Sequence, residues 1–454
     1  THLFREWILH PSDCMDKMKI TVVAVVAVVL VAACAIVLIT HESKSSEVEI
    51  NSQLRVFGNA DGNYTIDQND LDLIDDILAG KENFSDHPLA DANHDGKITE
   101  DDKTLVQQII NGDTCTVYHY NTCSTGDYVV STQWPVKSAL ATGSANMLWL
   151  LTMAGVNDMV HGISYSSSSP PDPTLFPTYS KMESIGGSST KMPIDNASSY
   201  ISKYNVTAII SDKTATTVDK DSVEPQYEEM NVDVIRVAPA SVDVDEFCSQ
   251  LFLIGFLFQT EDACKNIAEW WIGLQNEINS KLNGVEKKTA ITCNGTATTK
   301  GLWISAGTSD YVDVIRAAGG EYALDDSVLT SYSSGAYFST SDTWLYNYDF
   351  DYIVSIRTND WYSGTIDDTD KYESSLDILS HTKAYENHDA YVITGDAPIP
   401  LRIAYTAAVL YPEIFSEVWA DSLNQEFMDK FTDLDIDLSS LHFIISYDMA
   451  YGKA

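Results

Sequence analysis

One helical segment near the middle of the chain constrains the fold more than any other feature. Residues 245–284 predict a short helix, a break and a longer helix. Thr260 is expected to cap the longer helix at its N-terminus, and Asn283-Gly284 to end it. Its apolar residues recur at steps of three and four, the spacing of a buried helical face. They are Ile267, Trp271, Leu274, Ile278 and Leu282. The sequence therefore predicts a stiff connection between two flanking regions.

Both flanking regions alternate β-rich and helical runs. The first has expected strands at 128–131, 159–164, 206–211 and 232–237, and helices at 143–154, 195–203 and 222–230. The second has expected strands at 289–293, 302–306, 351–356, 390–394 and 443–447, and helices at 311–318, 374–381, 400–410 and 423–431. Apolar strands flanked by helices indicate parallel sheets that are covered on both faces. We therefore predict an α/β fold of two Rossmann-like lobes, 127–244 and 285–454, joined by the helix at 245–284.

The charge balance and the missing motifs exclude several functions. The 454 residues carry 27 Lys and Arg against 66 Asp and Glu, a net charge of -39. A nucleic-acid-binding surface would need a basic face, so we expect no nucleic-acid partner. The sequence has no G-x-S-x-G, HExxH or P-loop motif. We therefore expect a binding protein and not an enzyme.

The N-terminal region carries a signal for location. An apolar run covers residues 20–39, and about 20 such residues suffice to span a bilayer as a helix. Lys17 and Lys19 precede this run and Glu42 follows it, which places the rest of the chain outside the membrane. We predict a transmembrane anchor at 18–40 and an extracellular location at the cell membrane. A cleaved signal peptide and a lipid-modified Cys34 are the alternatives.

A repeated pattern follows between residues 54 and 113. Two loops carry oxygen-bearing side chains at positions 1, 3, 5, 9 and 12, and each runs into a helix. Calcium prefers six to eight hard oxygen ligands, and a loop of this kind can wrap them around one ion. The candidate ligand positions are Asn59, Asp61, Asn63, Thr65, Asp67 and Asp70 in the first loop, and Asp91, Asn93, Asp95, Lys97, Thr99 and Asp102 in the second. Two solvated acidic turns are the alternative interpretation.

These paired loop–helix units resemble a type I dockerin, a small α-helical domain. The resemblance covers about Leu54 to Asp113 and implies two bound Ca2+ ions and a cohesin-type partner. Loop positions 10 and 11, which usually take part in that recognition, are Gln68-Asn69 and Glu100-Asp101 here.

Cysteine positions leave the redox state open. Cys115 and Cys123 flank a Tyr-rich loop, and Cys248 and Cys264 lie within the central helical segment. Each pair could form a disulfide outside the cell, and Cys293 would then be left over. Free buried thiols are the alternative.

Several stretches of the last 330 or so residues stand in an order that is typical of a known family. They are Ala139–Leu151, Ile185-Gly-Gly leading to Pro193-Ile-Asp195, Ala317–Glu321, Asp351–Val354, and His388–Ile393 followed by Tyr411-Pro412-Glu413. By these stretches the region resembles the substrate-binding proteins of ABC importers whose lobes are joined by a long helix. The central helix falls where the family's interlobe helix does. This family serves ferric siderophores, haem and cobalamin.

The resemblance implies a metal chelate as ligand and an ABC permease and ATPase as partners. In the family an acidic residue on each lobe meets the permease, and the matching positions are Asp195 and Asp342. An ordinary N-cap is the alternative for each of them. Ligands in such sheets bind beyond the carboxyl ends of the strands, where this chain has aromatic residues and a few arginines.

Those strand ends and nearby loops supply the candidate ligand-binding residues. Aromatic rings can stack on a planar macrocycle, and a guanidinium can pair with its carboxylates. The candidates are Trp134, Tyr165, Tyr179, Tyr337, Arg357, Trp361, Tyr362 and Arg402. Core packing is the alternative for each aromatic residue, and a surface helix position for Arg402. His161, His381 and His388 do not form a ligand pattern, which disfavours a bare transition metal.

Two other functions remain open from the sequence. The chain could be a cell-surface scaffold or adhesion protein whose dockerin-like module binds a cohesin-type partner. It could also be a relative of the two-lobed enzymes that hold metal clusters, although the expected strand ends lack the cysteines that such a cluster needs.

Overall fold

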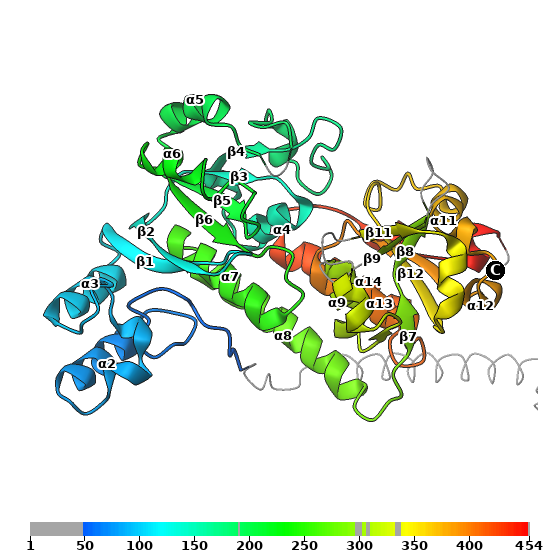
Figure 1. The fold of residues 1–454 in the computed structure, drawn as a ribbon, viewed down its shortest axis with the longest axis horizontal. Helices are drawn as coiled ribbons and strands as arrows, with labels where there is room; N and C mark the ends of the chain where they lie inside the picture. The colour runs from blue at the N-terminus through cyan, green and yellow to red at the C-terminus, as the bar shows by residue number, and fades with distance from the viewer. Residues whose placement is uncertain (1–48, 189–190, 296–301, 306–308, 332–336, 453–454) are drawn as a thin grey trace, which may run out of the picture. The chain divides into compact units, whose positions relative to one another are not determined.

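The computed structural model describes residues 49–188, 191–295, 302–305, 309–331 and 337–452 (Figure 1). The expected anchor at 18–40, with Cys34, lies outside these ranges. No helix within them is both long and apolar enough to cross a membrane. Residues 50–454 group into one compact unit.

The duplicated pattern forms two loop–helix units, α2 (Gln68–Leu78) and α3 (Glu100–Asn111). Both helices begin with the same capping box, Asp67 with Asp70 in one and Thr99 with Asp102 in the other. Two short 3-10 helices, η1 (Phe84–Asp86) and η2 (Pro88–Ala90), lie between them. The units share a small core of their own, made of Ala60, Leu71, Ile74, Ala90, Ala92 and Val106.

A hairpin leads from this module into the first lobe. β1 (Cys115–Asn121) and β2 (Tyr128–Trp134) pair in antiparallel fashion along their full length. Our prediction that residues 128–131 open the parallel sheet of lobe 1 is therefore wrong. The hairpin is attached to that sheet by a side chain, since Nδ2 of Asn121 donates to the carbonyl of Val234 (2.7 Å) and its Oδ1 accepts from the amide of Arg236 (2.8 Å).

Lobe 1 holds a four-stranded parallel sheet, in agreement with the sequence. Its order is β4-β3-β5-β6, with bounds β3 Ala139–Thr142, β4 Val160–Ser164, β5 Ala208–Asp212 and β6 Asp233–Val237. Its helices are α4 (Ala145–Met153), α5 (Ile194–Tyr204) and α6 (Glu224–Glu228), with 3-10 turns η3 (Asn157–Met159) and η4 (Tyr179–Lys181). The sequence did not reveal the four-residue strand β3, which is wholly buried and leads straight into α4.

The predicted interlobe segment consists of α7 (Val244–Phe258) and α8 (Glu261–Lys281), drawn in green in Figure 1. The break falls at Gln259, whose φ of 60° is left-handed. Thr260 is the N-cap by position, but its side chain makes no capping hydrogen bond, contrary to our expectation. The predicted apolar face of α8 is confirmed, because Ile267, Trp271, Leu274 and Ile278 are all buried.

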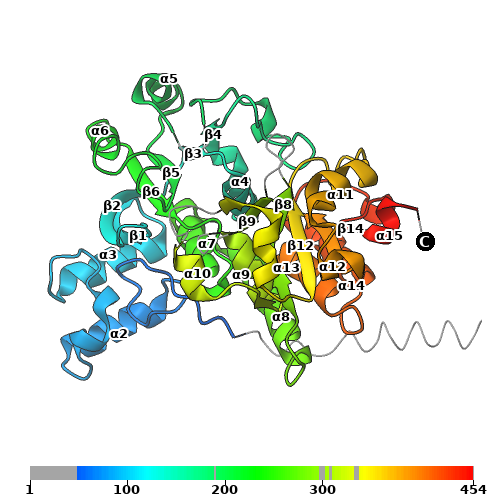
Figure 2. The ribbon, with the colours of Figure 1, turned by 45° about the vertical axis from the view of Figure 1, so that its right-hand side comes forward.

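The described residues of lobe 2 form two sheets. Figure 2 labels β8 and β9 of one and β12 and β14 of the other. The larger has the order β10-β7-β12-β13-β14. Its first four strands run parallel and β14 pairs antiparallel to β13 at one edge. The bounds are β7 Thr289–Ile291, β10 Glu321–Tyr322, β12 Tyr352–Arg357, β13 Ala390–Thr394 and β14 Ile444–Ser446. The smaller is antiparallel, with β8 Cys293–Gly295, β9 Leu302–Ser305 and β11 Tyr337–Thr340. We predicted a strand of the parallel sheet at 302–306. The strand exists, but it belongs to the smaller antiparallel sheet, so that part of the prediction is wrong.

The helices of lobe 2 match most of the predicted runs. They are α9 (Asp310–Ala317), α10 (Asp326–Ser331), α11 (Asp368–Leu376), α12 (Lys383–Glu386), α13 (Ile399–Leu410), α14 (Glu417–Phe431) and α15 (Tyr447–Ala450), with 3-10 turns η5 (Asp342–Asn347), η6 (Asp377–Leu379) and η7 (Leu438–Ser440). The predicted helix at 374–381 starts earlier than expected, because Asp367 accepts from the amide of Asp370 and caps α11 there.

The described cysteines are all buried and unpaired, so the disulfides that we considered are not formed. Burial raises the pKa of the Cys248 and Cys264 thiols to about 12, which keeps both protonated at neutral pH.

Candidate functional site

The two lobes meet where a helix follows a parallel strand in each of them. In lobe 1, β3 ends at Thr142 and α4 begins after Ser144, whose hydroxyl accepts from the amide of Met147 (3.3 Å). In lobe 2, β13 ends at Thr394 and α13 begins after Pro398. The carboxyl ends of parallel strands are where ligands bind in folds of this kind. We call the contact between these elements the interlobe seam and define it as Asn146, Trp149, Asp310, Asp396 and Arg402.

Arg402 lies at the centre of the seam. It is 3% exposed, and its Nε donates to the carbonyl of Ala397 (2.6 Å). Nη1 donates to Oδ2 of Asp310 in α9 (3.2 Å), and Nη2 donates to Oδ1 of Asn146 in α4 (3.0 Å). One guanidinium thus joins helices from both lobes. Arg402 is neither the exposed ligand contact nor the surface helix residue that the sequence suggested.

A second contact crosses the seam beside the first. The indole Nε1 of Trp149 donates to the carbonyl of Asp396 (2.8 Å). The carboxylate of Asp396 accepts from the amides of Asn359 (2.9 Å) and Trp361 (3.4 Å). Burial raises the pKa of the Asp396 carboxyl, and these two amides act in the opposite direction.

Four of the predicted ligand-binding aromatics belong to the core. Trp134, Tyr179, Trp361 and Tyr362 are each at most 3% exposed. Each polar atom is bound within the protein: Trp134 Nε1 to the carbonyl of Phe256, Tyr179 Oη to Asn157, Trp361 Nε1 to the carbonyl of Arg357, and Tyr362 Oη to Asn424. Large amphipathic rings are buried in this way when a partner is within reach. These four side chains leave no face for a ligand, so we correct their assignment.

Two predicted residues remain partly open to a ligand. Tyr165 follows β4 and is half-buried, with its hydroxyl donating to the carbonyl of Met182 (2.8 Å). Arg357 ends β12 and is also half-buried. The side chains of Tyr337 and Asp342 lie outside the part that the structure describes, although the backbones belong to β11 and η5.

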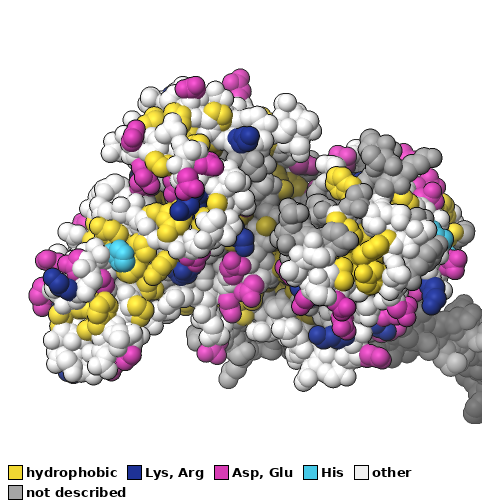
Figure 3. All heavy atoms as spheres, in the orientation of Figure 1, with side chains coloured by type: hydrophobic (Ala, Val, Ile, Leu, Met, Phe, Trp, Pro, Cys, Tyr) yellow, Lys and Arg dark blue, Asp and Glu magenta, His cyan; other side chains and the backbone are white. Residues whose placement is uncertain are grey.

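A cavity of about 640 Å³ lies beside the seam, and we call it the interlobe pocket. Lobe 1 contributes Lys213 after β5 and the segment that leads from β6 into α7. Lobe 2 contributes Asp310 and Asp313 from α9, so the seam forms part of its wall. Acidic side chains outnumber basic ones in its lining, as they do on the face of the molecule in Figure 3. None of these residues is among the ligand-binding candidates from the sequence, although Lys213 lies shortly after the strand predicted at 206–211.

The two predicted permease contacts, Asp195 and Asp342, both lie at the start of a helix. Asp195 is exposed in the first turn of α5, and Pro193 is the N-cap, so the capping alternative for Asp195 is wrong. Asp342 opens η5, directly after the cap position Ser341.

Hydrogen bonds between side chains and the backbone of the same region hold each of the two acidic loops in its conformation. In the second loop, Asp91 accepts from the amides of Asp95 (3.0 Å) and Gly96 (2.7 Å). In the first, Nδ2 of Asn59 donates to the carbonyls of Leu54 and Asn63, both at 2.7 Å, while its buried Oδ1 has no partner. Burial raises the pKa of Asp70 to about 6. Among the described residues, no group of three or more His, Cys, Asp or Glu is placed to hold a metal ion.

No protein-family model matches the sequence, and no curated protein matches it either. Solved structures do resemble the fold. A TroA-like periplasmic binding protein, FepB, from Veillonella parvula is 16% identical with a TM-score of 0.54, and the match covers 72% of this chain and 99% of that one. A periplasmic solute-binding protein from the same organism is 15% identical with a TM-score of 0.53, over 71% and 95% of the two chains. The molybdate-binding periplasmic protein MolA from Haemophilus influenzae is 12% identical with a TM-score of 0.51, over 69% and 97%.

At these identities the likeness concerns the fold. It confirms the predicted α/β architecture, because this chain shares the fold of two-lobed periplasmic binding proteins. The three structures are named as binding proteins.

Proposed function

We propose that the chain is the substrate-binding component of an ABC importer. An N-terminal helix anchors it in the cell membrane, with the lobes on the extracellular face. It captures a metal chelate between its lobes and delivers the chelate to a permease. Ferric siderophore, cobalamin and haem are the chelates that we propose. The observation that carries this proposal is the interlobe seam, where helices that follow a parallel strand in each lobe meet through Arg402 and Trp149.

Three further points support the proposal. Ligands of open parallel sheets bind beyond the carboxyl ends of the strands, and the interlobe pocket opens beside such ends in lobe 1. Its volume of about 640 Å³ falls within the range of about 300–1,000 Å³ that is usual for small-molecule sites. The structures that share the fold include proteins named for binding solutes and molybdate.

Calorimetry on the full chain in detergent tests the proposal with one ferric siderophore, haem and cobalamin as probes. We expect one of them to bind with a stoichiometry of one. If that chelate carries carboxylates, Arg357→Met should weaken its binding about tenfold or more, because a charged hydrogen bond contributes about 1.5–3 kcal/mol. Lys203→Met, on the exposed end of α5, is the matched control and should bind as the wild type does. Failure of all three chelates to bind the folded protein would contradict the proposal.

Delivery to the permease is tested separately from capture. Charge reversal of both Asp195 and Asp342 to Lys should abolish uptake in cells and leave the chelate affinity unchanged, because an acidic contact on each lobe would meet a repelling surface. Asp221→Lys, at another exposed acidic position of lobe 1, is the control and should take up chelate normally. Normal uptake by the double variant would refute these contacts.

We also propose that the loops before α2 and α3 each bind Ca2+. The donors have the chemistry that Ca2+ prefers, and the buried Oδ1 of Asn59 in the first loop is unpartnered within the described structure. Hydrogen exchange of the full chain tests this. Addition of EGTA should speed exchange across residues 54–113 and leave the lobes unchanged. Exchange that does not respond to EGTA in this region would rule out calcium sites.

A cohesin-type partner follows from the same resemblance, and with it the alternative of a cell-surface scaffold. Such a partner would have to bind the loop–helix module in a Ca2+-dependent manner. Binding of a purified cohesin domain to the full chain, lost in EGTA, would support the scaffold function. Chelate binding without any cohesin binding would leave the importer component as the function.

A further inference from the structure

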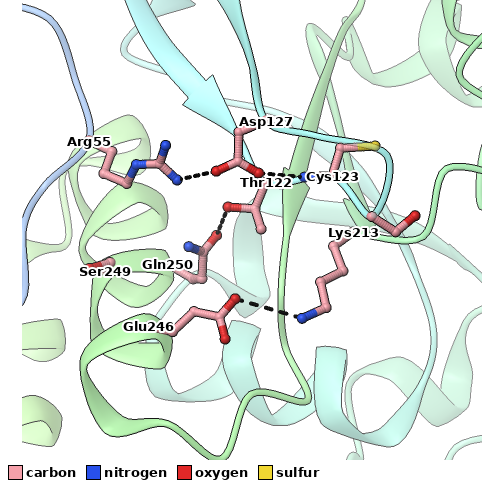
Figure 4. A pocket seen from close by; sticks show the side chains of 9 residues that line it. Arg55, Thr122, Cys123, Asp127, Lys213, Glu246, Ser249 and Gln250 are labelled. Carbon is pink, nitrogen blue, oxygen red and sulfur yellow. Dashed lines mark hydrogen bonds and ion pairs between the residues drawn. The ribbon is translucent and has the colours of Figure 1, made fainter. Parts of the chain in front are cut away.

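A second cavity, of about 280 Å³, lies where the N-terminal segment, the hairpin, lobe 1 and α7 come together (Figure 4). We call it the junction pocket. The N-terminal segment gives Arg55, the turn between β1 and β2 gives Asp127, and the residue after β5 is Lys213. Glu246 and Gln250 come from α7. Four segments distant in sequence therefore converge on one small polar cavity.

Two ion pairs, each of one basic and one acidic side chain, line this cavity. Nη1 of Arg55 lies 2.7 Å from Oδ2 of Asp127, and Nζ of Lys213 lies 3.7 Å from Oε1 of Glu246. The four charges cancel, so the pocket favours neither an anion nor a cation. The second pair is too long for a hydrogen bond, which leaves the ammonium of Lys213 with donors for another partner.

Gln250 adds a buried side-chain amide whose oxygen has a hydrogen-bond partner. The residue is 3% exposed, and its Oε1 accepts from the hydroxyl of Thr122 (3.2 Å). The amide nitrogen of Gln250 has no acceptor among the described residues, although an amide can donate twice. This amide nitrogen can therefore donate to a ligand oxygen in the pocket.

We propose that the junction pocket binds a small zwitterion with the charge pattern of a free α-amino acid or a betaine. The ligand's carboxylate would accept from Lys213 and from the amide of Gln250. Its cationic end would lie against the carboxylates of Asp127 and Glu246. The volume of about 280 Å³ is just below the range of about 300–1,000 Å³ for larger organic ligands, which fits a solute of this size.

This site is separate from the interlobe pocket, yet the two share a wall. Lys213 and Glu246 line both cavities. A zwitterion that engages these two side chains therefore changes the charges that face the interlobe pocket. The binding itself does not depend on the proposed import function, because it is measured with its own ligand.

Equilibrium dialysis of the full chain in detergent tests the inference with glycine betaine and alanine as probes. Acetate and tetramethylammonium, which carry one end of the charge pattern each, are the comparison solutes. We expect both zwitterions to bind saturably and about tenfold or more tighter than either single ion, because each single ion loses one charged contact. Absence of saturable zwitterion binding up to about 10 mM would overturn the inference.

Two variants locate the bound zwitterion. Gln250→Met removes the buried amide with little change in length, and Lys213→Met removes the half-exposed ammonium. Each should weaken zwitterion binding about tenfold or more. Gln108→Met, on the exposed side of α3, is the control and should bind as the wild type does. Because Lys213 is partly exposed, its variant keeps the test valid even if Gln250→Met does not fold. Unchanged binding in Lys213→Met would place the zwitterion elsewhere and overturn the inference.

Discussion

Two buried arginines, Arg236 in lobe 1 and Arg402 at the interlobe seam, perform different tasks in this acidic chain. Arg236 is 0% exposed. Among the described residues, its side chain bonds to partners in its own lobe and in the hairpin. Its Nη2 lies 2.5 Å from the buried Glu224, and its nitrogens also reach the Tyr128 hydroxyl (3.0 Å) and the carbonyl of Val218 (2.7 Å).

Arg402 has fewer partners, and they belong to different lobes. Its ion pair with Asp310 is longer, at 3.2 Å, and the side chain of Asp310 is 20% exposed. Its third partner is the neutral amide of Asn146. Buried pairs with full hydrogen bonding hold a structure in one arrangement, whereas pairs that can regain water separate at lower cost. The comparison indicates that Arg236 fixes the hairpin within lobe 1, while Arg402 joins two bodies that can move apart.

Removing Arg236 should have the largest effect on stability. Arg236→Met leaves Glu224 buried without its cation, and loss of one partner from such a pair costs about 3–5 kcal/mol. Chemical unfolding in urea measures the change. Arg316→Met is the control. It removes two exposed ion pairs, with Asp313 and Asp326, and each should cost at most about 1 kcal/mol. Equal losses for the two variants would mean that Arg236 is not the stronger attachment.

Removing Arg402 should lower the free energy of unfolding by a smaller amount and should loosen the contact between the lobes. Arg402→Met leaves Asp310 able to recover water, so we expect a loss of about 1–3 kcal/mol in the free energy of unfolding. Spin labels on the two lobes should show a broader distribution of interlobe distances than in the wild type. In Arg236→Met that distribution should be unchanged. A broader distribution in Arg236→Met alone would reverse the roles that we assign.

The indole contact at the seam should contribute less again. Trp149→Phe keeps an aromatic ring against Phe176 and Phe427 but removes the hydrogen bond to the carbonyl of Asp396. A neutral hydrogen bond contributes about 0.5–1.5 kcal/mol, and thermal unfolding can resolve such a change. Trp303→Phe, an exposed position on β9, serves as the control. A loss as large as that of Arg402→Met would place the centre of the seam at Trp149.

The smallest expected effect is a pH dependence of the seam. Burial raises the pKa of Asp396 above its usual 3.8, so the folded protein keeps a proton that the unfolded chain has already released. The contribution of this group therefore falls as the pH rises from about 3.8 through the higher folded value. Asp396→Asn should flatten that part of the profile of unfolding free energy against pH. An unchanged slope would show that the pKa of Asp396 is the same in the folded and unfolded states.

Sequence patterns revealed the lobes well and the seam poorly, for a physical reason. The apolar face of α8 and most strands follow from local periodicity. β3 has only four residues, and β2 pairs with β1 in a hairpin. The Asn121 side chain attaches this hairpin to β6, and no local pattern shows that contact. The seam joins Arg402 to partners 92 and 256 residues away, so only the tertiary fold brings them together.

The errors at the predicted ligand site have the same cause, because local sequence patterns do not show which way a side chain points in the tertiary fold. Trp134, Trp361 and Tyr362 follow or end strands, as ligand-binding residues often do. A strand end can equally point its side chain into the core, and the burial of these rings decides the matter. Only Tyr165 and Arg357 among the described candidates keep a partly open side chain.

Hydrogen exchange of the full chain, with and without the chelate that binds in calorimetry, tests the central claim most directly. Capture between the lobes predicts slower exchange on chelate addition at both sides of the seam, in residues 143–149 of lobe 1 and 396–402 of lobe 2. Protection confined to one lobe, or no protection at either segment while the chelate is bound, would contradict capture between the lobes.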